Sequence, residues 1–162
     1  MAEPIPIIWR KFEGPWGDAE ALGCRNLFYG QRLFLDLFDY QQSSPGEEIK
    51  IGDEVIPETH LIGLTESSRI WRITFDRPFA VRAHDINLNQ RNSEESGIPF
   101  PCNFTEDSHW LRGFDFEKVE FIPTHYLFAT LDAYIEIAGQ DQPEVEELPN
   151  DLAGQSPAGG MY

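Results

Sequence analysis

Basic residues are scarce in this chain of 162 residues, which has 12 lysines and arginines against 28 aspartates and glutamates. The formal net charge is −16, and the pI is about 4.4. Such a surface repels the phosphates of nucleic acids and of anionic membranes, so we expect neither as a partner. It attracts a basic protein instead. Acidity also keeps proteins soluble, and salt adaptation of the organism produces the same bias, so charge alone does not identify a partner.

The sequence also has few cysteines, no long hydrophobic run and no leader pattern. Cys24 and Cys102 are far apart and form no C-x-x-C pair, which favours two reduced, mostly buried thiols over a disulfide. The first residues lack a charged segment followed by a long apolar one, and no stretch approaches the ~20 apolar residues that span a bilayer. We therefore predict a soluble, cytoplasmic protein without membrane contact, and leave its oligomeric state open.

Signatures of common cofactor sites are missing as well. The histidines are His60, His84, His109 and His125. They form no HExxH or HxH spacing, and the chain has neither a Gly-rich phosphate loop nor a GxSxG nucleophile elbow. The stretch DINLNQRNSEES imitates a calcium loop only at its start, because Gln90 stands where glycine is required. We predict no metal and no cofactor.

What the chain does contain is apolar alternation with period two. In RIWRITF (69–75), Trp71, Ile73 and Phe75 alternate with polar residues, which is typical of a half-buried strand. RLFLDLFDY (32–40) is apolar on both sides and fits a covered central strand or a short helix. We predict a mainly β fold: an antiparallel barrel or sandwich of roughly seven to eight strands with one or two short helices.

Three further predictions concern local structure and domain limits. GDAEALGCRNL (17–27) is predicted as a short helix that Asp18 would cap and Gly23 would end. THLIGLT (59–65) is predicted to pair with the strand at 69–75. Residues 1–140 are expected to form a single globular domain. Residues 141–162 contain five acids, three prolines and no base, so we expect a flexible acidic, Pro- and Gly-rich tail.

The stretch THYLFATLDAYIEIAG (124–139) allows two interpretations. Thr124 and Gly139 are placed like the caps of a helix over 124–138, which would make the fold α+β. Its many aromatic and β-branched residues favour two strands instead, because these side chains suit a pleated surface. We prefer a hairpin that turns near Asp132. In that form His125 lies on the face opposite Tyr126, and Glu136 is an outward strand residue.

Arginines and histidines supply the candidate ligand-binding residues. Arg72 and Arg82 lie on the polar faces of two strands expected to be adjacent, and His84 follows Arg82 on the same face. With His125 they form a candidate anion site, because guanidinium groups bind carboxylate or phosphate through two hydrogen bonds. The alternative, which we favour, is that these arginines pair with neighbouring acids.

Three tryptophans are candidate interface residues, because tryptophan concentrates at binding hot spots. Trp9 and Trp16 lie in a Pro- and Gly-rich N-terminal segment, and Trp110 follows His109 after a long polar connection. They either close the ends of the barrel or sandwich, which we prefer, or line a groove.

The function that fits these features best is a non-enzymatic, acidic intracellular binding protein that engages a protein partner, as inhibitor, immunity and adaptor proteins do. Strong acidity, many aromatics and the lack of a catalytic signature support it. The alternative is a β-barrel that holds a small anionic or aromatic ligand, or an enzyme that uses His84 or His125 as a base. The catalytic residues of such an enzyme are not identifiable from the sequence.

Overall fold

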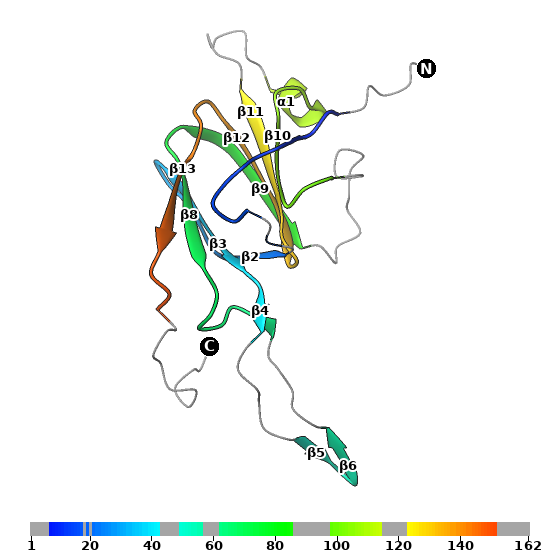
Figure 1. The fold of residues 1–162 in the computed structure, drawn as a ribbon. Helices are drawn as coiled ribbons and strands as arrows, with labels where there is room; N and C mark the ends of the chain where they lie inside the picture. The colour runs from blue at the N-terminus through cyan, green and yellow to red at the C-terminus, as the bar shows by residue number, and fades with distance from the viewer. Residues whose placement is uncertain are drawn as a thin grey trace, which may run out of the picture.

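The computed structural model describes residues 7–17, 19, 21–42, 49–56, 62–85, 98–114 and 123–151. Within these ranges the chain is mainly β, with antiparallel sheets and one short helix (Figure 1). The prediction of a mainly β fold is confirmed at this level. No helix in the described ranges is long and apolar enough to cross a membrane.

One sheet, which we call sheet A, has five strands that all pair antiparallel. Its strand order is β1 (Arg10–Lys11), β10 (Cys102–Thr105), β11 (Thr124–Ala129), β12 (Ala133–Gly139) and β9 (Pro78–Asp85). Strands β11 and β12 form the predicted hairpin, in which Thr124 pairs with Gly139 and Ala129 with Tyr134. The hairpin interpretation is therefore confirmed, and the alternative helix over 124–138 is wrong.

The second sheet, sheet B, has four antiparallel strands. Their order is β13 (Glu144–Leu148), β8 (Ile70–Phe75), β3 (Leu33–Asp39) and β2 (Leu22–Tyr29). Strand β3 lies between β2 and β8 and is buried on both faces, as its two-sided apolar pattern predicts. The strand interpretation of residues 32–40 is confirmed, and the helix alternative is wrong.

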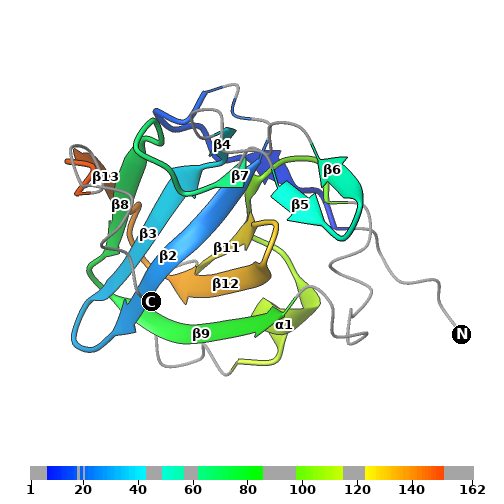
Figure 2. The same ribbon diagram turned by 90° about the horizontal axis from the view of Figure 1, so that it is seen from below.

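The two sheets share one hydrophobic core. Leu33, Leu35 and Leu37 of β3 meet Phe128 and Ile137 of the β11–β12 hairpin there. Each such buried side chain contributes about 1.5–3 kcal/mol relative to its exposed state. Figure 2, seen from below, shows sheet B and sheet A on either side of this interior.

The remaining described elements are short. Strands β4 (Gln41–Gln42) and β7 (Ile62–Gly63) pair with each other, as do β5 (Ile49–Ile51) and β6 (Glu54–Ile56). Gly52 turns the β5–β6 hairpin at a φ of 64°, a conformation that favours glycine. The helix α1 (His109–Arg112) begins after its cap Ser108, whose hydroxyl accepts a hydrogen bond from the Leu111 N–H.

The helix predicted at residues 17–27 is wrong, because residues 22–29 form strand β2. Gly23 does not end a helix. It pairs with Phe38 in β3, and a Cβ there would lie 2.3 Å from the Phe38 ring and 2.7 Å from the Tyr40 ring. Close packing of these rings explains the glycine, and pairing with β3 overrides the local helix signals. Asp18 lies outside the described residues.

Two predicted strand neighbours are also wrong. The segment 62–63 pairs with β4 rather than with β8, and consecutive strands β8 and β9 belong to different sheets. Strand β8 has both neighbours already, β3 on one side and β13 on the other. Strand β13 comes from residues expected to form a tail, so sheet B extends beyond residue 140. Beyond β13, the Asn150 side chain is also held in place, because its Nδ2 donates hydrogen bonds to the carbonyls of Thr65 and Ser68, both at 2.8 Å.

Candidate functional site

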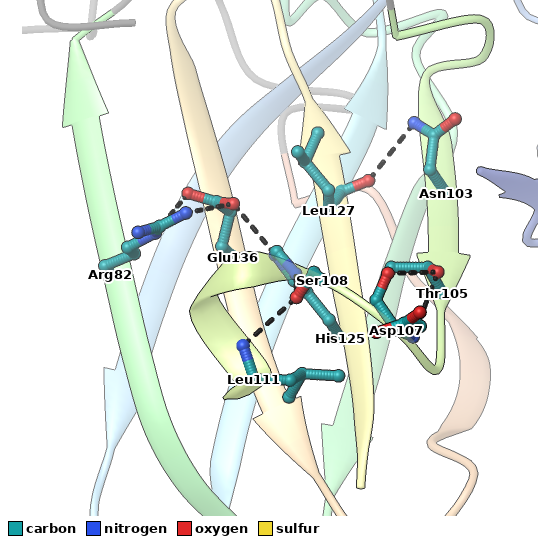
Figure 3. Close-up of polar contacts among 9 residues, drawn as sticks. All are labelled: Arg82, Asn103, Thr105, Asp107, Ser108, Leu111, His125, Leu127 and Glu136. Atoms are coloured by element: carbon teal, nitrogen blue, oxygen red, sulfur yellow. Dashed lines mark hydrogen bonds and ion pairs between the residues drawn. The ribbon is translucent and has the colours of Figure 1, made fainter. Parts of the chain in front are cut away.

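Three neighbouring strands of sheet A bring charged side chains together on the face turned away from the core (Figure 3). Arg82 on β9 lies directly opposite Glu136 on β12. His125 on β11 pairs with Ala138, two residues from Glu136, so it reaches the carboxylate diagonally. Their sequence neighbours Tyr126 and Ile137 point into the core. Strand alternation therefore places all three polar side chains on one face.

These residues and Ser108 form a continuous hydrogen-bonded chain that we call the His125 cluster. The Glu136 carboxylate accepts from Arg82 Nε at 2.5 Å and from Arg82 Nη2 at 2.8 Å. His125 Nε2 lies 2.8 Å from Glu136 Oε1, and His125 Nδ1 lies 2.8 Å from Ser108 Oγ. The distances fit an imidazole whose Nε2–H donates to the carboxylate and whose Nδ1 accepts from the serine hydroxyl.

Helix α1 and the N-terminal segment cover the His125 cluster. The Trp110 ring on α1 lies 4.8 Å from the His125 ring and also under the Arg82 guanidinium, at 4.5 Å. The Trp9 ring meets His125 edge-on at 5.1 Å. As a result His125 and Glu136 are 0% exposed, whereas the Arg82 side chain is 31% exposed.

The electrostatics of Glu136 follow from this burial. Burial alone would raise the pKa of Glu136, but the hydrogen bonds from His125 and Arg82 and the Arg82 charge hold this pKa below its ordinary value. The carboxylate is therefore ionised and fully paired. A buried carboxylate that is fully hydrogen-bonded holds its donors, here His125 and Arg82, in fixed positions.

The contacts of the His125 cluster hold helix α1 against sheet A. Ser108, His125 and Glu136 are hydrogen-bonded in the order serine, histidine, carboxylate. Enzymes that activate a serine nucleophile with a histidine base use the same residue types in the same order. Ser108 is 1% exposed, however, and its hydroxyl already bonds both His125 and the first turn of α1. The cluster thus ties α1 to sheet A. Within the described ranges, no three His, Cys, Asp or Glu side chains are grouped to hold a metal ion.

Four of the seven residues singled out from the sequence meet at this cluster, namely Trp9, Arg82, Trp110 and His125. The other three lie elsewhere. Trp16 is 6% exposed and packs edge-on against Trp71 in the core, at 6.1 Å. His84 lies two residues beyond Arg82 on β9, with its ring 5.6 Å from that of Tyr134.

Arg72 is on sheet B, so the expected neighbourhood of Arg72 and Arg82 is wrong. Arg72 donates to Asp36 through Nε at 2.8 Å and Nη2 at 3.0 Å, and Asn26 adds a third hydrogen bond at 3.2 Å. Burial alone would raise the pKa of Asp36, but these hydrogen bonds and the Arg72 charge hold it below its ordinary value. The Arg72 guanidinium also lies 5.4 Å from the centre of the Phe34 ring.

Ion pairing extends to most of the arginines. Seven of them pair with a carboxylate: Arg25 with Asp151, Arg32 with Asp76, Arg69 with Glu147, Arg72 with Asp36, Arg77 with Asp141, Arg82 with Glu136 and Arg112 with Asp107. Positive charge is therefore largely neutralised within the chain. Outside these seven pairs, 21 acidic residues remain against five basic ones, which gives the net charge of −16.

Sequence reasoning missed Ser108 and misjudged Glu136. Glu136 is an outward strand residue, as predicted, but the covering helix makes it buried rather than solvent-exposed. Once the hairpin turn is placed at residue 132, counting outward puts Leu127 opposite Glu136 and His125 beside it. Ser108 carries a cap signal before a short apolar run, which could have been recognised. Nothing local in the sequence indicates that Ser108 lies beside His125.

An exposed apolar surface lies on sheet B, at the far end of edge strand β2. Leu27, Phe28 and Tyr29 are 39%, 63% and 49% exposed. Phe28 pairs with Phe34 of β3, and their rings lie 6.3 Å apart. Strand β2 ends the strand order of sheet B, so its other side is available to a further strand within the part of the chain described. We call these three residues the β2 edge.

Comparison of the chain with protein-family models, with curated proteins and with solved structures finds no match.

Proposed function

We propose that this chain is a non-enzymatic binding protein that engages a basic protein partner through the β2 edge. The observation that carries the proposal is the exposure of Leu27, Phe28 and Tyr29 on the last strand of sheet B. Natural edge strands are normally blunted by charge, proline or covering segments, because an open apolar edge recruits other chains. Three consecutive large side chains left in water support a role in recognition.

An edge of this kind suits a partner that adds an extended segment. Such a segment hydrogen-bonds to the backbone groups on the outer side of β2 that have no partner among the described residues, and the exposed side chains select its residues. The arrangement of the sheets is part of the proposal. Strand orders that end at β1 and β9, and at β13 and β2, support an open sandwich rather than a closed barrel.

Charge supports a basic partner. The net charge is −16, and an unlike partner is steered to such a surface during encounter. The alternative, a pocket for a small anion, has less support because both Arg72 and Arg82 are held by carboxylates. Ser108 and His125 are buried, which likewise supports a binding role over catalysis.

The test compares two variants with matched exposure. Phe28 on the β2 edge and Ile51 on the β5–β6 hairpin are each 63% exposed. We expect wild type and Ile51→Asp to capture the same basic protein from a lysate of the host at low salt, and Phe28→Asp to lose it. The captured protein is then purified and titrated against all three by calorimetry. Loss of one hot-spot aromatic lowers affinity about tenfold or more.

High salt should weaken the reconstituted complex, because charge attraction is screened. The proposal is overturned if no basic protein binds after purification. It is equally overturned if Phe28→Asp binds as tightly as Ile51→Asp.

A further inference from the structure

A cleft of about 440 Å³ opens at the other end of sheet B, beyond the last residues of β3. Asp39 and Tyr40 line it together with Ala21, Ile62 of β7 and Leu131 of the β11–β12 turn. The cleft thus joins segments from both sheets and from the small β4–β7 pair, which Figure 2 shows beside β3. A single long side chain fits within this volume with room to spare.

Large apolar side chains form the rim of this cleft and are left in water. Ile62 is 68% exposed and Leu131 is 53% exposed. Burying such side chains under a ligand is favourable, at about 25 cal/mol per Å² of apolar surface removed from water. The rim therefore fits the aliphatic part of a ligand.

The polar groups of the cleft are acidic. Asp39 accepts hydrogen bonds from the backbone N–H of Arg69 and from Gln41 Nε2, the latter at 2.9 Å. The Tyr40 hydroxyl donates to Asp132 Oδ2 at 2.6 Å. Burial, together with this bond, raises the pKa of Tyr40 to about 12, so the phenol stays neutral and the negative charge here belongs to the two carboxylates. A cation is the complementary ligand group.

The walls are held in place before any ligand arrives. Thr130 Oγ1 accepts from the N–H groups of Asp132 and Ala133 and donates to the Ala133 carbonyl, which fixes the turn that carries Leu131. The Leu131 N–H donates to the Leu22 carbonyl at 3.0 Å. Fixed walls reduce the entropy that binding must overcome.

We infer that this cleft binds an arginine side chain of the basic partner. The inference rests on the proposed function, since it names a second contact for the same partner. The aliphatic stem packs against Ile62 and Leu131, while the guanidinium meets the Asp39 carboxylate and the face of the Tyr40 ring. Planar guanidinium groups both pair with carboxylates and stack on aromatic rings, whereas an ammonium group does so less well.

The test uses n-butylguanidinium as a probe, with n-butanol as its uncharged match. Amide chemical shifts of ¹⁵N-labelled full-length protein are followed by NMR during each titration. We expect saturable shifts at Ala21, Tyr40 and Leu131 with n-butylguanidinium and none that saturate with n-butanol. Asp39→Asn and Ile62→Ser should each weaken binding about five- to tenfold. Asp53→Asn, on the exposed turn of the β5–β6 hairpin, should leave binding unchanged.

The inference is overturned if n-butylguanidinium gives no saturable shifts, if n-butanol binds equally well, or if both cleft variants bind as wild type does. Ile62→Ser changes an exposed residue, so it reports on the cleft even where Asp39→Asn disturbs the fold. The two proposals fail separately. Binding of the probe without capture of a basic protein would uphold the ligand class of the cleft and overturn the proposed function. Capture that depends on Phe28 without probe binding would do the reverse.

Discussion

Sheets A and B each bury one carboxylate on an outer face, and the two carboxylates are protected differently. Glu136 on β12 is 0% exposed and Asp36 on β3 is 2% exposed. Each accepts two hydrogen bonds from an arginine on the neighbouring strand, Arg82 on β9 and Arg72 on β8. Each arginine in turn lies over an aromatic ring. The two sites are thus chemically alike within their sheets.

They differ in what lies above them. Helix α1 and the N-terminal segment cover Glu136, and its carboxylate also accepts a hydrogen bond from His125. Asp36 is shielded by side chains of its own sheet, Asn26 and Arg72. The pair on sheet A therefore anchors a separate segment of the chain, whereas the pair on sheet B only joins adjacent strands. Removing the arginine charge from each of the two sites should therefore lower the unfolding free energy by unequal amounts.

The largest effect is expected for Arg82→Met, which keeps the apolar stem but removes the charge. Water cannot reach Glu136 beneath α1, so an uncompensated buried carboxylate should cost roughly 3–5 kcal/mol of unfolding free energy. Each carboxylate keeps one other donor, His125 at Glu136 and Asn26 at Asp36. Arg72→Met should nevertheless cost less, about 1–3 kcal/mol, because water can reach Asp36 from the outer face of sheet B. Urea unfolding of both variants measures the difference. Equal losses would show that the cover over sheet A contributes nothing.

His125→Phe should have the next largest effect. The ring keeps its place between Trp9 and Trp110, but Ser108 and Glu136 each lose a buried partner, which costs about 2 kcal/mol. The control is His109→Phe, an exposed residue of α1, expected within about 0.5 kcal/mol of wild type. Adding Ser108→Ala to His125→Phe should cost at least about 0.5 kcal/mol less than the sum of the single effects. Strict additivity would contradict a connected cluster.

Acid should weaken both sites. The pKa of Glu136 lies below its ordinary value of 4.5, and that of Asp36 below 3.8. The folded state therefore binds fewer protons than the unfolded state, so their stabilisation is complete above these ordinary values and is lost as pH falls through the lowered ones. Glu136→Gln should be less stable than wild type at neutral pH, and the gap should narrow below about pH 4.5. A gap that is constant with pH would contradict the pairing.

The smallest effect is expected where an ion pair is open to water. Arg32 and Asp76 are joined at 2.7 Å, but their side chains are 47% and 50% exposed. Asp76→Asn should change the unfolding free energy by no more than about 0.5 kcal/mol, because solvent screens such pairs. The same urea titration measures it. A loss as large as that of Arg72→Met would remove the distinction between buried and exposed pairs.

Periodicity predicted the parts of the fold that depend on local burial. The alternation in β8 and the β-branched content of the β11–β12 hairpin indicated strands correctly. The two-sided apolar pattern of β3 fitted a strand or a short helix, and the strand is the one that forms. Periodicity failed at β2, where Gly23 serves ring packing against β3, and at β13, whose acidic residues resemble a tail. The partner of β13, strand β8, lies about seventy positions earlier in the chain, and local pattern carries no information about it. Strand β2 pairs with the next strand, β3, and there the cap-like residues at 17–27 misled the prediction although the partner is near in sequence.

Four residues of the candidate site were singled out from the sequence, but Ser108, the buried role of Glu136 and the assembly of the site were not. Arg82, His125, Trp9 and Trp110 each had a reason to be singled out. Their convergence depends on β9 lying beside β12, a pairing between residues about fifty positions apart. It also depends on α1 folding back over the sheet. Neither the strand order of sheet A nor the covering helix is encoded in a short motif.

The β2 edge has a consequence for the protein in concentrated solution. An edge strand that exposes Leu27, Phe28 and Tyr29 to water favours association with its own copies, and the mutual repulsion of molecules carrying a charge of −16 opposes this. Near the pI of about 4.4 that repulsion disappears, and high salt screens it at neutral pH. Colloidal stability therefore depends on the acidic surface, and Phe28→Asp should extend the solubility limit under both conditions.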